Sequence, residues 1–241
     1  MLESSRTSVD HTISRQVQEN FTTYFRIFDG LPGITFVDAD VIWNTSKGAP
    51  GNIVLSTQLS PSNVDVGIHD TLRRIGRHAD NVDWFVFPNC RPLDLGDRLV
   101  ACHDAGGPDD EWELYGNIGG PGGNWMWADL NALPDRIALP EGFHVKRVAD
   151  QQMLNQWVEI NARGFGATDY SSFHAAYARH GFGEDALAHH YIGFVDAEPV
   201  TSSTLLVAGG SASAYNISTP EELRRQGFGK AISHATLRAA L

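Results

Sequence analysis

Near its C-terminal end the chain reads Arg224-Arg225-Gln226-Gly227-Phe228-Gly229-Lys230. A strand-like segment, residues 213–217, comes before this heptapeptide, and a helix-like segment, residues 231–241, follows it. A glycine-rich turn between a strand and a helix directs several backbone N–H groups toward one point, and the positive end of the helix dipole lies there too. Glycine at 227 and 229 lets a phosphate approach the backbone. The pattern therefore predicts a phosphate-binding loop.

Two common phosphate-binding motifs do not fit this loop. The P-loop requires Gly-x-x-x-x-Gly-Lys-Ser/Thr, a spacing that the chain lacks. The dinucleotide fingerprint requires a third glycine where this chain has Ile232. Because Gly-x-Gly also occurs in ordinary turns that bind nothing, the prediction depends on the flanking strand, the helix and the arginines.

Residues 217–231 as a whole resemble the acyl-CoA-binding motif of the GNAT superfamily of N-acetyltransferases, which has an Arg-x-x-Gly-x-Gly core. The resemblance implies a mixed α/β (α+β) fold, acetyl-CoA as co-substrate without a metal, and transfer of the acetyl group to an amine. In such a site the pyrophosphate is held by backbone amides of the loop, and the pantetheine arm lies along the strand end. The cofactor-binding residues that it implies are Ile217, Ser218, Thr219, Arg224, Arg225, Gln226, Gly227, Phe228, Gly229 and Lys230.

The C-terminal half shows an order of elements that extends the resemblance upstream. The proline-containing segment 131–142 predicts a boundary between residues 1–135 and 136–241. Beyond it the pattern predicts a strand at 143–148, a helix from Asp150 to Gly164, a second helix at 171–180 and a hairpin of strands 190–195 and 200–207. This order resembles the first part of a GNAT domain. A complete domain continues with strand, helix and strand, so residues 136–241 are expected to form a GNAT domain that is incomplete at its C-terminus.

The N-terminal half resembles the second part of the same fold. Periodicity and turn residues predict a helix near residues 13–24, strands at 34–43, 52–59, 83–87 and 124–130, helices at 62–78 and 93–102, and a loop at 106–123. Ser62 or Asn63 is the expected cap of the second of these helices. No Gly-x-Gly precedes that helix, so this half is expected to be a degenerate GNAT-like copy that does not bind CoA.

Composition excludes several classes of protein. The 241 residues are 42% apolar and 20% charged, as in soluble globular proteins. A net charge of −11 argues against a nucleic-acid or anionic-membrane partner. Neither a signal peptide nor a long apolar segment is apparent, which predicts a cytoplasmic protein. Two cysteines, Cys90 and Cys102, are too few for a disulfide framework.

No residue is assigned as general base or acid. Tyr191, Glu184, Asp185 and Glu198 carry suitable groups, but a strand anchor, a helix cap and a turn explain them equally well. The adjacent His189 and His190 point to opposite faces of a strand, which predicts no shared metal. The acceptor is a small-molecule or peptide amine of unknown identity. The alternative is a catalytically inactive CoA-binding or protein-interaction module. A sheet edge left open by the incomplete domain is expected to favour a homo-oligomer.

Overall fold

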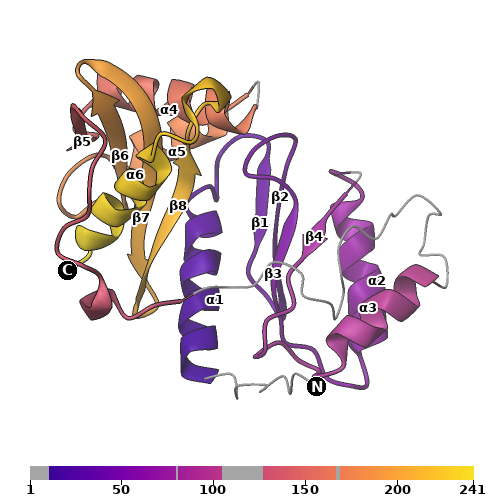
Figure 1. Ribbon diagram of the computed structural model, residues 1–241. Helices are drawn as coiled ribbons and strands as arrows, with labels where there is room; N and C mark the ends of the chain where they lie inside the picture. The colour runs from indigo at the N-terminus through magenta and orange to yellow at the C-terminus, as the bar shows by residue number, and fades with distance from the viewer. Residues whose placement is uncertain (1–10, 80, 105–126, 167–168) are drawn as a thin grey trace.

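The computed structural model describes residues 11–79, 81–104, 127–166 and 169–241. Two four-stranded sheets lie side by side, and the first helix, α1 (His11–Arg26), stands between them (Figure 1). The predicted loop at 106–123 falls outside the described residues, as do residues 124–126 of the predicted strand 124–130.

The N-terminal sheet has the order β1-β2-β3-β4. Its strands are β1 (Ile34–Val37), β2 (Val41–Ser46), β3 (Ile53–Thr57) and β4 (Asp83–Trp84). The first three strands are antiparallel, whereas β3 and β4 are parallel and joined through helix α2 (Val64–Ile75). Helix α3 (Leu95–Asp104) follows. The order here is helix, three antiparallel strands, helix, parallel strand and helix, and the degenerate GNAT-like copy stays a prediction.

The C-terminal sheet is antiparallel throughout, in the order β5-β6-β7-β8. Its strands are β5 (Phe143–Arg147), β6 (Ala188–Val195), β7 (Glu198–Ala208) and β8 (Ser211–Ser218), and its helices are α4 (Gln151–Phe165), α5 (Ser171–His180) and α6 (Phe228–Arg238). Successive strand residues face opposite sides of a sheet. His190 contacts Trp157 of α4 and Tyr177 of α5, while Tyr191 joins the apolar cluster under α6. Helices α4 and α5 therefore cover one face and α6 the other.

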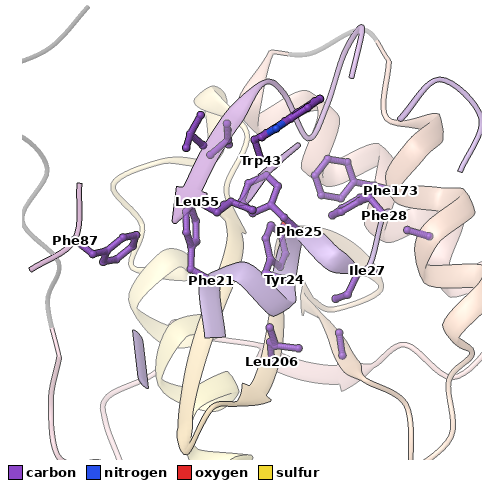
Figure 2. Packing of buried hydrophobic residues seen from close by; sticks show 14 of the residues in the cluster. Phe21, Tyr24, Phe25, Ile27, Phe28, Trp43, Leu55, Phe87, Phe173 and Leu206 are labelled. Atoms are coloured by element: carbon purple, nitrogen blue, oxygen red, sulfur yellow. The ribbon is translucent and has the colours of Figure 1, made fainter. Parts of the chain in front are cut away.

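Helix α1 contributes to the cores of both halves. Phe21 packs edge-on against Phe85 in the N-terminal half, and Phe28 packs edge-on against Phe173 of α5. Figure 2 shows these α1 aromatic side chains in one group with Leu55 of β3, Leu206 of β7 and Phe173 of α5. One apolar cluster thus runs through both halves, and the division at residues 135 and 136 stays a prediction.

Two buried polar side chains attach α1 to both sheets. The side-chain nitrogen of Gln18 donates to the carbonyl of Leu55 in β3 at 3.0 Å. The side-chain nitrogen of Asn20 donates to the carbonyls of Leu206 and Ser211, at the end of the β7–β8 hairpin, at 3.3 and 3.0 Å. Residues two apart in a helix project about 200° apart, so these amides face opposite sheets. The hydrogen bonds to these carbonyls offset the free-energy cost of burying the two amide groups.

Several predicted elements are confirmed and others are corrected. The predicted single strand 34–43 is wrong, because the chain turns at residues 38–40 and pairs β1 with β2. The polar Asp38 at this turn is ion-paired with Arg26 at 2.6 Å. Strand 83–87 is shorter than predicted and ends at Trp84. The described residues of the predicted strand 124–130 form no strand, because Asp129 accepts from the backbone N–H of Asn131 and starts a 3₁₀ turn at 130–132.

The predicted helix boundaries agree better with the structure where the sequence contains a capping residue. Asp150 caps α4 as expected, accepting from the N–H of Met153 at 2.8 Å. Asn63 occupies the cap position of α2, but its side chain accepts from Ser60 instead. Helix α2 ends at Ile75, three residues earlier than expected, and α6 begins at Phe228 instead of Ala231. Gly164 does not end α4, which continues to Phe165 and is capped by Gly166 in the left-handed conformation.

Burial of His190 predicts acid sensitivity. Burial lowers the pKa of His190 from 6.5 to about 3, and the nearby His189 and His180 act in the same direction. The unfolded chain therefore binds this proton more readily than the folded chain, so its contribution to stability is present above pH 6.5 and is lost as the pH falls toward 3. Between pH 7 and pH 5 we expect this single group to remove about 2 kcal/mol from the free energy of unfolding. Urea unfolding of the wild type and of His190→Gln at both pH values measures it; equal losses in the two proteins would contradict the assignment.

No helix among the described residues is both long and apolar enough to cross a membrane. Nor do the described ranges contain three or more His, Cys, Asp or Glu side chains grouped to hold a metal ion. Cys90 and Cys102 are buried free thiols.

Candidate functional site

The predicted phosphate loop connects the end of β8 to the start of α6. Gly227 is the residue that caps α6, and it has a φ of 87°. That left-handed value is accessible to glycine at no steric cost. Arg225 also has a positive φ, 66°. The first N–H groups of an α-helix have no acceptor within the helix, so those of residues 228–230 are available to an anion at this point.

Side chains of the loop divide into exposed and buried groups. Arg224, Arg225, Gln226 and Lys230 are exposed. In the described part of the chain, neither Arg225 nor Lys230 forms an ion pair, which leaves both charges for an incoming anion. Phe228 is buried and stacks on Phe143 of β5, with ring centroids 5.7 Å apart. The Phe228 side chain therefore anchors the start of α6, and only its backbone belongs to the loop surface.

Arg224 serves the structure of the loop. Its guanidinium donates to the carbonyl of Thr219 at 3.0 Å and to that of Gly164 at 2.9 Å. A second link joins the same two segments, because Arg163 is ion-paired with Glu222 at 2.6 Å. The predicted phosphate contact of Arg224 stays a prediction, whereas its bonds to the end of α4 are present without any ligand.

The end of β8 lies against the last turn of α4. Ser218 is buried, and its hydroxyl donates to the carbonyls of Ile160 and Asn161, both at 3.4 Å. A Cβ placed on Gly164 would lie 1.8 Å from the Ser218 oxygen. While Ser218 keeps these bonds, only glycine fits at this position. This close approach explains Gly164, which the sequence analysis placed at the end of the helix.

The predicted pantetheine strand runs along one edge of the sheet. Ile217 is 38% exposed, and Thr219 is half-buried with its hydroxyl 3.0 Å from that of Thr201. Strand β8 is the last of its sheet in the described ranges, so no further strand covers its outer edge there. The register of β7 and β8 shifts between Ser202 and Thr204, and Asn216 in the facing segment of β8 has a φ of 51°. These two features mark a β-bulge.

The structure does not place the four residues considered as general base in a catalytic arrangement. Glu184 is ion-paired with Arg147 at 2.9 Å, and Asp185 beside it is exposed. Both lie in a turn before β6, so the expected helix cap is wrong. Tyr191 is half-buried on β6, and burial raises its pKa. Glu198 is exposed at the start of β7. No catalytic acid or base is assigned.

One hollow in the described surface lies elsewhere. It is lined by Leu59, Pro61, Arg91, Pro92, Leu93 and Asp94, next to the segment that leads into α2. This segment lacks a Gly-x-Gly sequence and contains Pro61. The hollow therefore offers no phosphate cradle, and the loop at 224–230 remains the candidate site.

Comparison with solved structures identifies the architecture. A GCN5-related N-acetyltransferase from Kribbella flavida matches 97% of this chain and 81% of its own, with a TM-score of 0.58 and 16% identity. A putative acetyltransferase from Pyrococcus horikoshii matches 44% of this chain and 37% of its own, with a TM-score of 0.36 and 12% identity. An aminoglycoside acetyltransferase from an uncultured soil metagenomic sample matches 41% and 69%, with a TM-score of 0.34 and 18% identity.

Comparisons of the sequence, by contrast, found no match. No family model matches this chain, and no curated protein matches it. The conclusion about architecture therefore rests on the three-dimensional likeness to the Kribbella protein, which extends over both halves.

Proposed function

We propose that this chain, which has the fold of the GNAT N-acetyltransferases, transfers an acetyl group from acetyl-CoA to an amine. The observation that carries the proposal is the loop at the start of α6. Gly227 turns the backbone there in a left-handed conformation, and the loop connects the end of β8, the last strand of its sheet in the described ranges, to the first N–H groups of the helix. A diphosphate and an extended pantetheine arm complement these two features. The diphosphate is an anion that suits the helix N–H groups, and the pantetheine arm carries amides that pair with a strand.

Each part of the site has a separate task in this proposal. Backbone amides of Gln226, Gly227, Phe228, Gly229 and Lys230 bind the pyrophosphate, and the exposed side chains of Arg225 and Lys230 add positive charge. Backbone groups of Ile217, Ser218 and Thr219 bind the pantetheine arm. Arg224 holds the loop against α4 through the carbonyl of Gly164, and it also contributes its charge.

The chemical step is an addition followed by an elimination. The amine nitrogen forms a bond to the thioester carbon, the carbonyl oxygen gains negative charge, and the carbon–sulfur bond then breaks. The amine releases a proton and CoA leaves as the thiol, so that atoms and charge balance. A backbone N–H on the edge of β8 stabilises the charge on the oxygen, and the remaining contribution of the protein is to hold the two reactants together.

Calorimetric titration of acetyl-CoA into the whole chain tests the proposal. We expect a dissociation constant within about 1 µM to 1 mM. Pantetheine, which lacks the phosphates, is expected to bind far more weakly, because the loop has nothing to hold. Absence of acetyl-CoA binding by folded protein would contradict the proposal. Binding would justify a screen of small-molecule and peptide amines, with release of the CoA thiol as the readout.

A further inference from the structure

Asn216 has an unusual backbone for a residue within a strand. Non-glycine residues with a positive φ in the described ranges are Asp196, Asn216 and Arg225. Asp196 lies in the β6–β7 turn and Arg225 in the phosphate loop, where the chain must reverse. Asn216, with a φ of 51°, lies within β8. A residue holds such a conformation only when its surroundings enforce it, and these residues concentrate at functional sites.

Two buried tyrosines hold the side chain of Asn216 and so help to enforce its backbone conformation. The hydroxyl of Tyr24, on α1, donates to the Asn216 side-chain oxygen at 3.1 Å and accepts from its nitrogen at 2.9 Å. The same nitrogen donates to the hydroxyl of Tyr177, on α5, at 3.0 Å. Tyr24 is 5% exposed and Tyr177 is fully buried. Figure 2 shows Tyr24 among the apolar side chains of α1.

Asn161 of α4 holds the main chain of the same residue. Its side-chain nitrogen donates to the carbonyl of Asn216 at 2.9 Å and to the hydroxyl of Ser202, on the facing strand, at 3.0 Å. Asn161 is fully buried. Three helices from separate parts of the sequence therefore converge on one residue of β8. Both the side chain and the carbonyl of Asn216 are fixed, so the peptide that leads to Ile217 is held as well.

We propose that Tyr24, Tyr177 and Asn161 are positioning residues that hold the β8 bulge at Asn216 so that the next backbone N–H meets the thioester carbonyl of acetyl-CoA. A bulge changes the direction of the backbone groups next to it, and Ile217, whose side chain is 38% exposed, follows the bulge directly. This inference rests on the proposed function. It gives α1, which lies 192 positions away in sequence from Asn216, a direct part in the acyl site of the other half.

Acyl preference tests this role separately from CoA binding. We would measure the dissociation constants of acetyl-CoA and of CoA for the wild type, Tyr24→Phe and Tyr177→Phe by calorimetry. One hydrogen bond to the carbonyl predicts about three- to tenfold tighter binding of acetyl-CoA than of CoA by the wild type. Both variants are expected to lose the preference, because the bulge is released, and still to bind CoA, because the phosphate loop is intact.

Tyr215→Phe is the matched control. Tyr215 stacks on Tyr24 with centroids 4.0 Å apart, and its hydroxyl donates to the Asn20 side-chain oxygen at 2.8 Å. The control thus loses the hydroxyl of a half-buried tyrosine from the same interface of α1 and β8 without removing a bond to Asn216. We expect it to lower the melting temperature and to keep the preference for acetyl-CoA. All ratios are measured at a temperature at which the four proteins are folded.

The outcomes separate this inference from the proposed function. If the wild type binds neither ligand, both fall together. If it binds acetyl-CoA and CoA equally, or if Tyr24→Phe and Tyr177→Phe keep the wild-type ratio, the CoA site stands and the positioning role is overturned. Loss of the preference in Tyr215→Phe to the same extent would also overturn it, because a general loosening of the interface would then explain the result.

Discussion

Replacing Gly229 by aspartate is expected to abolish acetyl-CoA binding while the protein stays folded. Gly229 is the second residue of α6, and its φ is not in the left-handed region. A Cβ at this position would come no closer than 3.8 Å to the Thr219 hydroxyl, which is ordinary contact. A carboxylate in the first turn interacts favourably with the helix dipole, by about 0.3–1 kcal/mol, so α6 gains stability. The same carboxylate occupies the anion position and repels a diphosphate.

Calorimetry and thermal unfolding together measure this effect. We expect the dissociation constant for acetyl-CoA to rise at least about 100-fold, corresponding to about 2.8 kcal/mol of binding free energy, with an unchanged or slightly higher melting temperature. The matched control is Gln152→Glu, which adds the same charge at the second residue of α4, where the side chain is exposed. That control should bind acetyl-CoA as the wild type does. Wild-type affinity in Gly229→Asp would show that the pyrophosphate binds elsewhere.

Gly227 is a poorer position for this test. Its φ of 87° means that any side chain there strains the turn as well as blocking the anion. Lost binding in a Gly227 variant would therefore not distinguish a blocked site from a distorted loop.

The largest loss of stability is expected from Gly164→Ala. Alanine is intrinsically the better helix former by about 1 kcal/mol, so helix propensity alone predicts stabilisation. The structure predicts the opposite sign, because the new Cβ would lie 1.8 Å from the Ser218 oxygen and 3.2 Å from the Thr219 nitrogen. To accept it, the Ser218 hydroxyl must rotate away from the carbonyls of Ile160 and Asn161, and the end of β8 must move from α4 by a few tenths of an ångström. We expect the free energy of unfolding to fall by about 3 kcal/mol.

A double mutant identifies the cause of that loss. Ser218→Gly removes both the hydroxyl and the Cβ that oppose residue 164, so the double mutant Gly164→Ala/Ser218→Gly should be less destabilised than the sum of the two single mutants, by about 1–2 kcal/mol. Gly183→Ala is the control, because a Cβ at that exposed turn meets nothing within 4 Å. It should change stability by less than about 0.5 kcal/mol. Additive effects in the double mutant would contradict the close approach of α4 to β8.

The sequence was most informative where structure depends on neighbouring residues. The cap at Asp150, helix α5 from Ser171 to His180 and the glycine loop before α6 were all predicted, because cap chemistry, helical periodicity and turn residues act over a few positions. The single strand predicted at 34–43 was wrong. A polar turn of three residues interrupts an apolar run there, and the composition of that run alone does not show where the chain reverses.

The sequence by itself thus predicted the glycine loop before α6 and the order of the elements in the C-terminal half, and it showed a resemblance to an acetyltransferase fold. Only the tertiary structure showed that Gly164 lets the end of β8 lie close to α4, that Arg224 binds two carbonyls, and that Tyr24 holds Asn216. These contacts join residues up to 192 positions apart. A hydrogen bond or a close approach of that kind leaves no periodic pattern along the chain, because its partners are brought together only when the sheets and helices pack.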